Sequence, residues 1–543
     1  MADVVLINPR TQWDVKGVTT RLPLACLYIG SMLKAHGFSV ALIDQRVNDR
    51  WAEDLHCLLR ERPLWVGITS MTGRQIQWGL NASQIVREID PSIPIVWGGV
   101  HPSILPEQTV SHLLVDIVAI GEGELTALEL TQALKERTTR SSEADLDLSH
   151  IDGLVWQSDG KIIRNHHRVP SDMDEWPLLD YSLVKVEDYI LCEVPGERSL
   201  QITTSRGCPM HCGYCYLGTV PDGRLYRAEE PERVVDHIQR MMNSFGIDTV
   251  HIIDDEFFTR FNRAREICRL IIERGIRVTL RANCRIDYIN RFGEEDLRLF
   301  RQAGFKHMYL GAESGSDRIL QFIRKGITVQ DILEANQRLK RAGIAPKFSF
   351  MAGFPTETMK EVKATLKLMG RVVRENPNAY CTPVQLFSPY PGTALFDYCL
   401  QTGMRMPVAL DEWTEWGWEM INYSWLKPRE NRLLGNIALF SFFLDGKTVP
   451  ESATRLWFRF AAQLYGAVVR LRVRLGFFGF MPEVEAIRWE YDNLSRRKDR
   501  ERRSHYEPAN GASIENLASI PSEPSEPVDP TVRPTSQITS PPD

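Results

Sequence analysis

Three cysteines stand within eight residues of this chain, and their spacing constrains the fold more than any other feature of the sequence. Cys208, Cys212 and Cys215 form a C-x3-C-x2-C pattern directly after the apolar run at residues 200–204. Thiolates at this spacing can surround one soft metal centre, either zinc or an iron–sulfur cluster. The chain therefore has to present a loop of three convergent thiols at the end of a buried strand.

Zinc and a disulfide are the alternatives to a cluster at this loop. A structural zinc takes four ligands, and His211 is the nearest candidate for the fourth. A histidine beside Cys212 cannot easily point at the same metal, and no second C-x2-C or H-x3-H pair follows at zinc-finger distance. Ten cysteines in 543 residues without a secretory segment indicate a reducing compartment, which disfavours a disulfide. A [4Fe-4S] cluster held by three thiolates, with one iron open, is the remaining interpretation.

The aromatic residue Tyr214, just before the last cysteine, completes a motif that resembles the signature of radical S-adenosylmethionine (SAM) enzymes. The resemblance implies that the open iron of the cluster binds SAM. It also implies that one-electron reduction cleaves SAM to methionine and a 5′-deoxyadenosyl radical. The chain is then expected to be an enzyme with an oxygen-sensitive [4Fe-4S] cluster.

The first 136 residues alternate short apolar runs with amphipathic stretches, which predicts an α/β domain with a doubly wound parallel sheet. We expect strands at residues 4–8, 40–44, 65–70, 95–98 and 117–120. Ligands of such sheets bind at the carboxyl ends of the strands. Glycines gather at those ends, at Gly98, Gly99, Gly121 and Gly123, although glycine also serves ordinary tight turns.

Beside the cysteine motif, residues 1–136 resemble the cobalamin-binding domain that precedes many radical SAM modules. The resemblance is carried by Pro23-Leu24, by Gly98-Gly99-x-His101, and by residues 116–118 before Gly-Glu-Gly-Glu. It implies a cobalamin pocket with contacts from Ser70, Thr72, Gly98, Gly99, His101 and Gly121. His101 is also compatible with a turn histidine that caps the backbone. The loop at residues 9–17 contains no histidine, so the resemblance implies cobalt without a histidine beneath it.

Residues 137–197 are expected to form a linker with a small hairpin around residues 158–160. From residue 198 to 395 the alternation resumes with six strands, which predicts a partial (β/α)6 barrel. Polar clusters follow the predicted strands, and the functional groups of such barrels lie at the strands' carboxyl ends. Helix capping would account for any one cluster, but it does not readily explain five of them on one rim.

The resemblance to radical SAM enzymes gives these clusters roles. It implies that Asp255 and Glu256 receive the amino group of SAM and that Arg281 or Arg285 binds its carboxylate. It further implies that Glu313 and Ser314 bind the ribose hydroxyls and that Gly353 lets the backbone approach the adenine.

Residues 396–495 are predicted to be helical and are rich in tryptophan and arginine. Residues 451–482 have two interpretations: an amphipathic segment at a membrane surface, or a helix that packs its aromatic residues on the barrel beneath snorkelling arginines. Residues 496–543 begin with a charged run, expected to be a solvated face, and continue into a tail rich in Ser, Pro, Glu and Thr. This tail is predicted to be disordered.

Composition and the absence of a signal-like or membrane-spanning run predict a cytoplasmic protein. A net charge of −5 gives no overall electrostatic case for nucleic acid. The N-terminus reads directly into a strand, and no long uncharged apolar run is present. The expected partners are a small-molecule substrate and a one-electron donor such as flavodoxin or ferredoxin, with peripheral membrane contact as an open alternative.

Together the two resemblances predict a cobalamin-dependent radical SAM methyltransferase that acts on an unactivated carbon of a small natural product or lipid. The rivals are a radical oxidative cyclase of the tetrapyrrole type and, outside catalysis, a corrinoid-binding module. A methylthiotransferase would want a second set of cluster cysteines near the N-terminus, which Cys26 and Cys57 do not supply. The sequence leaves the substrate open.

Overall fold

The computed structural model describes residues 2–11, 14, 19–140, 147–192, 196–417, 423–447, 456–477, 481 and 484–485. The chain groups into two compact units, Met1–Met481 and Pro482–Asp543. The architecture below belongs to the first unit. The predicted charged run and tail at residues 496–543 lie outside the described residues.

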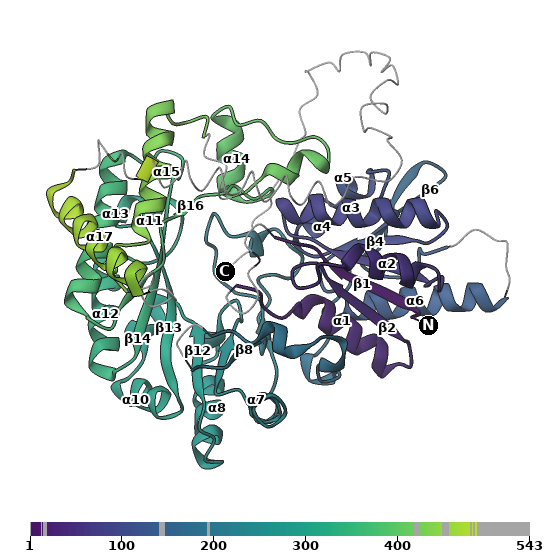
Figure 1. Cartoon of the computed structure of the whole chain (residues 1–543), viewed down its shortest axis with the longest axis horizontal. Coiled ribbons are helices and arrows are strands. Elements are labelled where there is room, and N and C mark those ends of the chain that lie inside the picture. Colours follow the sequence, from purple (N-terminus) through teal and green to yellow (C-terminus); the bar gives the residue numbers. More distant parts are fainter. Residues whose placement is uncertain are drawn as a thin grey trace, which may run out of the picture. The chain divides into compact units, whose positions relative to one another are not determined.

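The N-terminal part is built on a seven-stranded sheet in the order β2-β1-β3-β4-β5-β6-β7 (Figure 1). Five parallel strands confirm the predicted doubly wound sheet: β1 (Val4–Asn8), β2 (Val40–Asp44), β3 (Trp65–Thr69), β4 (Ile95–Gly98) and β5 (Ile117–Ala119). The predicted hairpin consists of β6 (Leu154–Ser158) and β7 (Lys161–Arg164), and β6 pairs antiparallel with β5. The hairpin is therefore part of the N-terminal sheet, which extends past residue 136 into the stretch that was expected to be a linker with a separate hairpin.

Helices cover both faces of this sheet, which explains why its central strands are apolar along their whole length. They are α1 (Leu24–Ala35), α2 (Trp51–Leu59), α3 (Arg74–Ile89), α4 (Val100–Ile104), α5 (Pro106–Val110) and α6 (Glu124–Arg140). Apolar residues of α2 and α3 form one buried cluster with alternate residues of β1 and β3. Helices α1 and α6 lie together on the opposite face (Figure 1).

The central part is a second, all-parallel sheet whose strands run in the order β15-β14-β13-β12-β11-β8, with β16 paired to β14. Its strands are β8 (Ser199–Ile202), β11 (Thr249–Ile252), β12 (Thr279–Asn283), β13 (Phe305–Glu313), β14 (Ala345–Ala352), β15 (Tyr380–Cys381) and β16 (Gln385–Leu386). The strand path does not close on itself, as predicted for a partial barrel. A short antiparallel pair, β9 (Ser205–Arg206) and β10 (Arg227–Ala228), flanks the cysteine loop.

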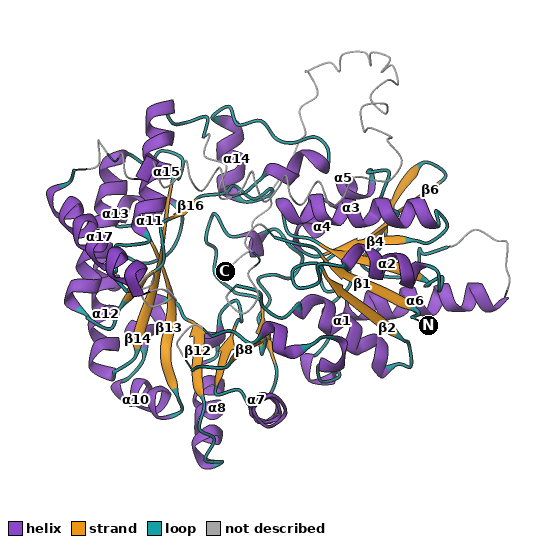
Figure 2. Ribbon diagram, in the orientation of Figure 1, coloured by secondary structure: helices purple, strands orange, loops and turns teal. Residues whose placement is uncertain are grey.

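Helices follow the strands of the second sheet and lie on its outer face (Figure 2). They are α7 (Pro231–Phe245), α8 (Phe261–Glu273), α9 (Ile286–Arg291), α10 (Glu294–Gln302), α11 (Asp317–Phe322), α12 (Val329–Ala342) and α13 (Met359–Glu375). Along β14, residues facing these helices are fully buried and alternate with partly accessible residues on the inner face. The alternation leaves the inner face of the sheet available for ligands.

The C-terminal region contains α14 (Ala394–Gln401), α15 (Pro428–Ser441) and α17 (Leu456–Leu475). Phe396, Leu410 and Trp413 belong to the same buried cluster as Ile76 of α3 and Trp97 of β4. This region therefore packs on the N-terminal domain as well as following the barrel. Trp418, one of the tryptophans in the stretch 396–495, lies outside the described residues.

Helix α17 only partly follows the prediction that its apolar residues pack on the barrel. Val469 and Val473 are buried. A second stripe is 45–72% exposed, at Phe460, Leu464, Val468, Leu471 and Leu475. No helix in the described ranges is long and apolar enough to cross a membrane.

Candidate active site

The three cysteines lie in a loop between β9 and β10, and all three are partly buried. Gly207 starts the loop with a φ of 85°, and a Cβ atom there would lie 2.2 Å from the Leu225 carbonyl oxygen. Only glycine fits this turn without displacing the backbone. The amide of Cys208 donates to the Gly223 carbonyl at 3.0 Å, which fixes the first thiol.

The thiols suit a soft metal centre by their chemistry. Burial raises the pKa of Cys208, and burial raises that of Cys215 to about 11. Metal binding to these thiols must therefore displace protons. No group of three His, Cys, Asp or Glu side chains in the described ranges is placed to hold a single metal ion.

Arg285 approaches the thiols from the end of β12. Its Nη1 lies 3.8 Å from the Cys212 sulfur, its Nη2 donates to the Lys325 carbonyl at 2.9 Å, and its Nε donates to Asp287 at 2.8 Å. Arg281, the other predicted carboxylate ligand, is buried and donates at 2.8 Å to both oxygens of Glu197. The structure thus brings Arg285, and not Arg281, to the cysteine loop.

The three carboxyl groups after β11 have separate environments. Asp254 is buried and accepts hydrogen bonds from the amide and hydroxyl of Thr204 and the hydroxyl of Ser205, at 2.6–2.7 Å, so it supports the backbone before the loop. Asp255 is exposed and accepts from the amide of Gly207 at 2.9 Å. Glu256 is buried, accepts from the amide of Phe258 at 3.2 Å, and has a pKa raised by burial to about 8. Asp255 is therefore the more accessible carboxylate.

Glu313 ends β13 in a left-handed conformation with a φ of 57°. Its carboxylate accepts hydrogen bonds from the Tyr214 hydroxyl at 2.9 Å and from Lys325 Nζ at 2.7 Å. The cysteine loop, β13 and the turn after α11 meet at this carboxylate. Lys325 was missed in the sequence because no motif surrounds it, and the role of Tyr214 in positioning Glu313 depends on residues 99 positions apart.

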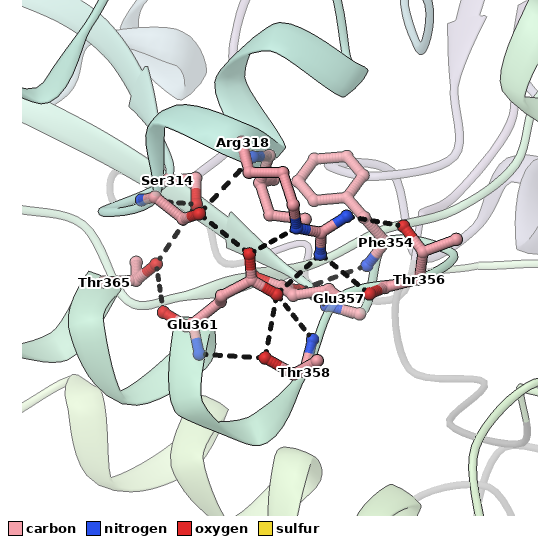
Figure 3. A network of polar contacts seen from close by, with 11 residues as sticks. Ser314, Arg318, Phe354, Thr356, Glu357, Thr358, Glu361 and Thr365 are labelled. Atoms are coloured by element: carbon pink, nitrogen blue, oxygen red, sulfur yellow. Dashed lines mark hydrogen bonds and ion pairs between the residues drawn. The ribbon is translucent and has the colours of Figure 1, made fainter.

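Ser314 belongs to the network of polar contacts in Figure 3. Ser314 Oγ accepts from the Ser316 amide at 3.2 Å and lies 3.4 Å from Thr365 Oγ1. The Glu361 carboxylate receives Arg318 Nε at 2.7 Å and caps its own helix through Thr358. These contacts tie the end of β13 to the first turns of α13.

Gly353 has a φ of 91° and donates its amide to Glu357 at 2.7 Å. A Cβ atom at Gly353 would lie 2.6 Å from the ring of Tyr423, so the position again requires glycine. Burial raises the pKa of Glu357 to about 7, and its Oε1 is buried without a hydrogen-bond partner in the described structure. Sequence reasoning did not select Glu357, although it lies only four residues after Gly353.

The N-terminal domain contains a mostly apolar cavity of about 280 Å³, which lies between the sheet and helices α1 and α6 and reaches the carboxyl ends of β3, β4 and β5. Gly98, Gly99 and Gly121 line it, together with apolar residues of α1 and α6. A Cβ atom at Gly98 would meet nothing closer than 3.6 Å, so a side chain there would enter the cavity. The cavity thus offers a backbone-lined, apolar cradle of the kind that the tail of a cobalamin requires.

The other predicted cobalamin contacts lie outside this lining. Ser70 is buried and donates to the Met71 carbonyl at 2.8 Å. Thr72 Oγ1 lies 3.0 Å from His101 Nδ1, and His101 is buried edge-on against Trp413, with ring centroids 5.5 Å apart. Of the predicted loop at residues 9–17, the structure describes residues 9–11 and 14, so most of it lies outside the described residues.

Arg206 connects the cavity to the cysteine loop. It lines the cavity, stacks over Trp176 and Tyr28 at 4.4 and 5.0 Å from their ring centres, and donates to Glu124 at 2.6 Å. It stands two residues before Cys208. Sequence reasoning missed this residue, because its partner Glu124 lies 82 positions away.

Two family models match the chain. The B12 binding domain matches residues 17–131, and the radical SAM superfamily matches residues 202–369. An uncharacterized methyltransferase of Pyrococcus horikoshii is 31% identical over 76% of this chain and 86% of its own length. The anaerobic magnesium-protoporphyrin IX monomethyl ester cyclase of Rubrivivax gelatinosus is 27% identical over 72% of this chain and 69% of its own length.

The fold is also that of a solved structure. The radical SAM methyltransferase TsrM from Kitasatospora setae, determined with cobalamin and a [4Fe-4S] cluster bound, superposes with a TM-score of 0.63. The match covers 87% of this chain and all of that chain at 17% identity. Because both family models match and the relative from Pyrococcus horikoshii is 31% identical, the chain belongs to the radical SAM superfamily, in the group whose members carry a B12-binding domain.

Proposed function

We propose that this protein is a cobalamin-dependent radical SAM methyltransferase that acts on an unactivated carbon. The observation that carries the proposal is the shared wall between the two sites. Thr203 and Arg206, which lead into the cysteine loop, also line the cavity of the B12-binding domain. A cobalamin bound at this cavity would therefore lie beside the cysteine loop, where the radical is proposed to form.

Three cofactors are assigned to this chain by the proposal: a [4Fe-4S] cluster on Cys208, Cys212 and Cys215, SAM, and cobalamin. When bound, they supply a hydrogen-abstracting radical and a transferable methyl group. The residues then act by holding and orienting. Arg285 fits the carboxylate of SAM and Asp255 its amino group, because both face the cysteine loop and carry the complementary charge.

Residues at the carboxyl ends of β13 and β14 are proposed to contact the rest of SAM. Glu313 and Ser314 are proposed for the ribose side and Gly353 for the adenine side. Glu313 is held in place by Tyr214 and Lys325, which reduces the freedom it would lose on binding. Glu256 stays in the proposal as a buried neighbour of the amino group.

The rival function is the oxidative cyclase, which the relative from Rubrivivax gelatinosus favours. Methyl-deuterated SAM and the true substrate separate the two. Methylation is expected to give one labelled methyl group on the product, with 5′-deoxyadenosine and S-adenosylhomocysteine in about equal amounts. 5′-Deoxyadenosine with an unlabelled product and no S-adenosylhomocysteine would rule out the methyltransferase and leave the cyclase.

The cluster assignment has its own test, which needs no substrate. The Cys208→Ala, Cys212→Ala, Cys215→Ala triple variant is expected to lose its iron after anaerobic reconstitution, together with reductant-dependent 5′-deoxyadenosine. A flavodoxin or ferredoxin would serve as electron donor. Wild-type iron content in the triple variant would contradict the assignment.

A further inference from the structure

The cysteine loop reaches the protein surface between its first two thiols. Pro209 and His211, which lie between Cys208 and Cys212, are both exposed, whereas the three thiols are partly buried. This tip of the loop is therefore accessible to a large molecule that approaches the thiols from outside. What lies around the tip decides which kind of molecule fits there.

Three exposed arginines lie on the connections that leave the neighbouring strands β11, β12 and β13. Arg260 precedes α8, Arg291 ends α9, and Arg324 lies two residues after α11. These connections begin at the carboxyl ends of the strands, and so does the segment that leads from β8, the neighbour of β11, to the cysteine loop. We call Arg260, Arg291 and Arg324 the arginine edge.

Arg260 is close to the first cysteine of the loop. Its guanidinium carbon lies 5.6 Å from the centre of the Tyr226 ring. The amide nitrogen of Tyr226 lies 3.3 Å from the position of a Cβ atom on Gly207, the residue before Cys208. One aromatic residue therefore lies between Arg260 and the backbone that leads into Cys208.

Arg291 extends the arginine edge from the start of α8 toward α12. Its guanidinium carbon lies 5.2 Å from the centre of the ring of Phe261, the residue that follows Arg260. The side chain of Asn290, beside Arg291, donates to the carbonyl of Asp331 in the first turn of α12 at 3.0 Å. Helix α9 therefore links the beginnings of these two helices.

Arg324 lies beside the second half of the cysteine loop. The carbonyl of Ile323, the preceding residue, accepts from the amide of Gly213 at 2.9 Å. The carbonyl of Lys325, the following residue, accepts from Arg285 at 2.9 Å. The arginine edge therefore borders the cysteine loop before its first thiol and after its second.

The arginine edge carries charge that the protein leaves without a partner. The structure describes all of the three connections, at residues 253–260, 284–291 and 314–328. Their other cations form ion pairs: Arg285 with Asp287, Arg318 with Glu361 and Lys325 with Glu313. Each of their carboxylates accepts a hydrogen bond: Asp254, Asp255, Glu256, Asp287 and Asp317. In these connections, only the three arginines are charged side chains with neither an ion pair nor a hydrogen bond.

We propose that the arginine edge is the docking surface for the one-electron donor, a small electron-transfer protein with an acidic face. This inference names a partner of the cysteine site and therefore rests on the proposed function. Interfaces of electron-transfer proteins are small and transient, and complementary charges raise their rate of encounter more than their affinity. Carboxylates of the donor would pair with the three arginines and place its redox group beside Pro209 and His211. The donor loses one electron and the cluster gains it, with no atom transferred.

Rapid-freeze kinetics on the full-length protein, with its cluster and cobalamin reconstituted, test the inference. The low-temperature EPR signal of the reduced cluster is followed after mixing with reduced flavodoxin or reduced ferredoxin. The Arg260→Glu, Arg291→Glu, Arg324→Glu triple variant is expected to be reduced at least tenfold more slowly than wild type at low ionic strength. The difference is expected to shrink at about 1 M salt, where the screening length is about 3 Å. Biolayer interferometry with the oxidised donor is expected to show weaker binding by the same variant.

The matched control reverses three exposed arginines elsewhere, in an Arg60→Glu, Arg137→Glu, Arg277→Glu variant. Its net charge changes by the same amount, and Arg60 and Arg277 precede β3 and β12, at the amino ends of the strands. The control is expected to be reduced as fast as wild type. A triple variant with lysine at the three positions of the arginine edge keeps the charge and is expected to retain most of the rate. Photoreduced deazaflavin, a small reductant that needs no docking surface, is expected to reduce all four proteins equally.

Two results would overturn the inference. One is an equal rate with flavodoxin or ferredoxin in the glutamate variant of the arginine edge and in the control variant. The other is a wild-type protein that deazaflavin reduces but that neither donor protein reduces.

Reduction of the cluster requires no methyl transfer, so this inference and the proposed function can fail separately. If the arginine edge controls reduction but methyl-deuterated SAM gives an unlabelled product, the docking surface stands and the methyltransferase fails. If the product carries the labelled methyl group while the glutamate variant is reduced as fast as the control, the docking surface alone fails.

Discussion

Arg206 Nη2 lies 2.6 Å from Glu124 Oε1, and this ion pair joins the cysteine loop to the first turn of α6 in the B12-binding domain. Both side chains are largely buried, and the guanidinium is stacked over Trp176. A buried pair of this kind cannot lose one partner cheaply, because the remaining charge is left without compensation. The geometry of the two sites is therefore coupled through one arginine.

Arg206→Met is expected to reduce cobalamin affinity at least tenfold and to lower the free energy of unfolding by about 3–5 kcal/mol. The reason is that the substitution leaves the Glu124 carboxylate without its bonded cation and removes part of the cavity wall. Cobalamin binding is measured by absorbance titration and stability by denaturant unfolding. Arg227→Met is the control, since Arg227 bonds the neighbouring Glu122 without lining the cavity. Equal cobalamin affinity in the two variants would show that Arg206 serves stability alone.

Gly207→Ala is expected to lower the iron content of the reconstituted protein. Its Cβ atom would meet the Leu225 carbonyl at 2.2 Å, so the backbone before Cys208 must move. Gly246→Ala is the matched control, because Gly246 also has a positive φ, of 59°, but no atom lies within 4 Å of its Cβ position. Both variants pay about 1–3 kcal/mol of backbone strain, and only Gly207→Ala should lose iron. Full iron in Gly207→Ala would mean that the loop adapts.

The sequence predicted the strands well because their residues repeat with a period of two or form short apolar runs, and both signals are local. The cysteine loop could be predicted for the same reason. The partners of Arg206 and Glu313 could not, because they converge only when segments 82 and 99 residues apart are folded. No local pattern reports such contacts.

The choice between Arg281 and Arg285 depends on where the strand ends, which the sequence pattern did not reveal. Arg281 lies inside β12, two residues before its end, so its side chain belongs to a level below the rim. Arg285 follows the strand, at the rim. The hairpin at β6 and β7 was predicted as a hairpin, but its pairing with β5 depends on edge complementarity, which periodicity does not encode.

His101→Asn is expected to flatten the loss of stability in acid. Burial lowers the pKa of His101 to about 4, below its ordinary value near 6.5. The unfolded chain therefore binds a proton more readily than the folded protein between these values, so the stability held above pH 6.5 is lost as pH falls through 4. The difference amounts to about 3 kcal/mol. Denaturant unfolding of wild type and His101→Asn at pH 7 and 4.5 measures this difference. An equal loss of unfolding free energy between the two pH values in both proteins would assign the acid sensitivity to other histidines.

The exposed stripe of α17 gives the membrane alternative a direct test. If Leu464 and Leu471 enter a bilayer, the Leu464→Glu, Leu471→Glu double variant should pellet less with anionic liposomes than wild type. Val408→Glu is the control, because Val408 is also exposed but lies outside α17. Equal pelleting of wild type and the double variant would remove membrane contact from consideration.

Arg285→Met is expected to weaken SAM binding about tenfold or more, equivalent to about 1.4 kcal/mol, because it removes the cation nearest the cysteine loop. Arg285→Lys should recover only part of this, since one ammonium cannot reproduce contacts made by Nε, Nη1 and Nη2. Arg281→Met should instead lower stability by about 3–5 kcal/mol, because Glu197 is left buried and unpaired. Equilibrium dialysis with labelled SAM, on variants with full cluster content, measures the affinities. Weak SAM binding in a folded Arg281→Met variant, with normal SAM binding in Arg285→Met, would show that Arg281 binds the carboxylate of SAM.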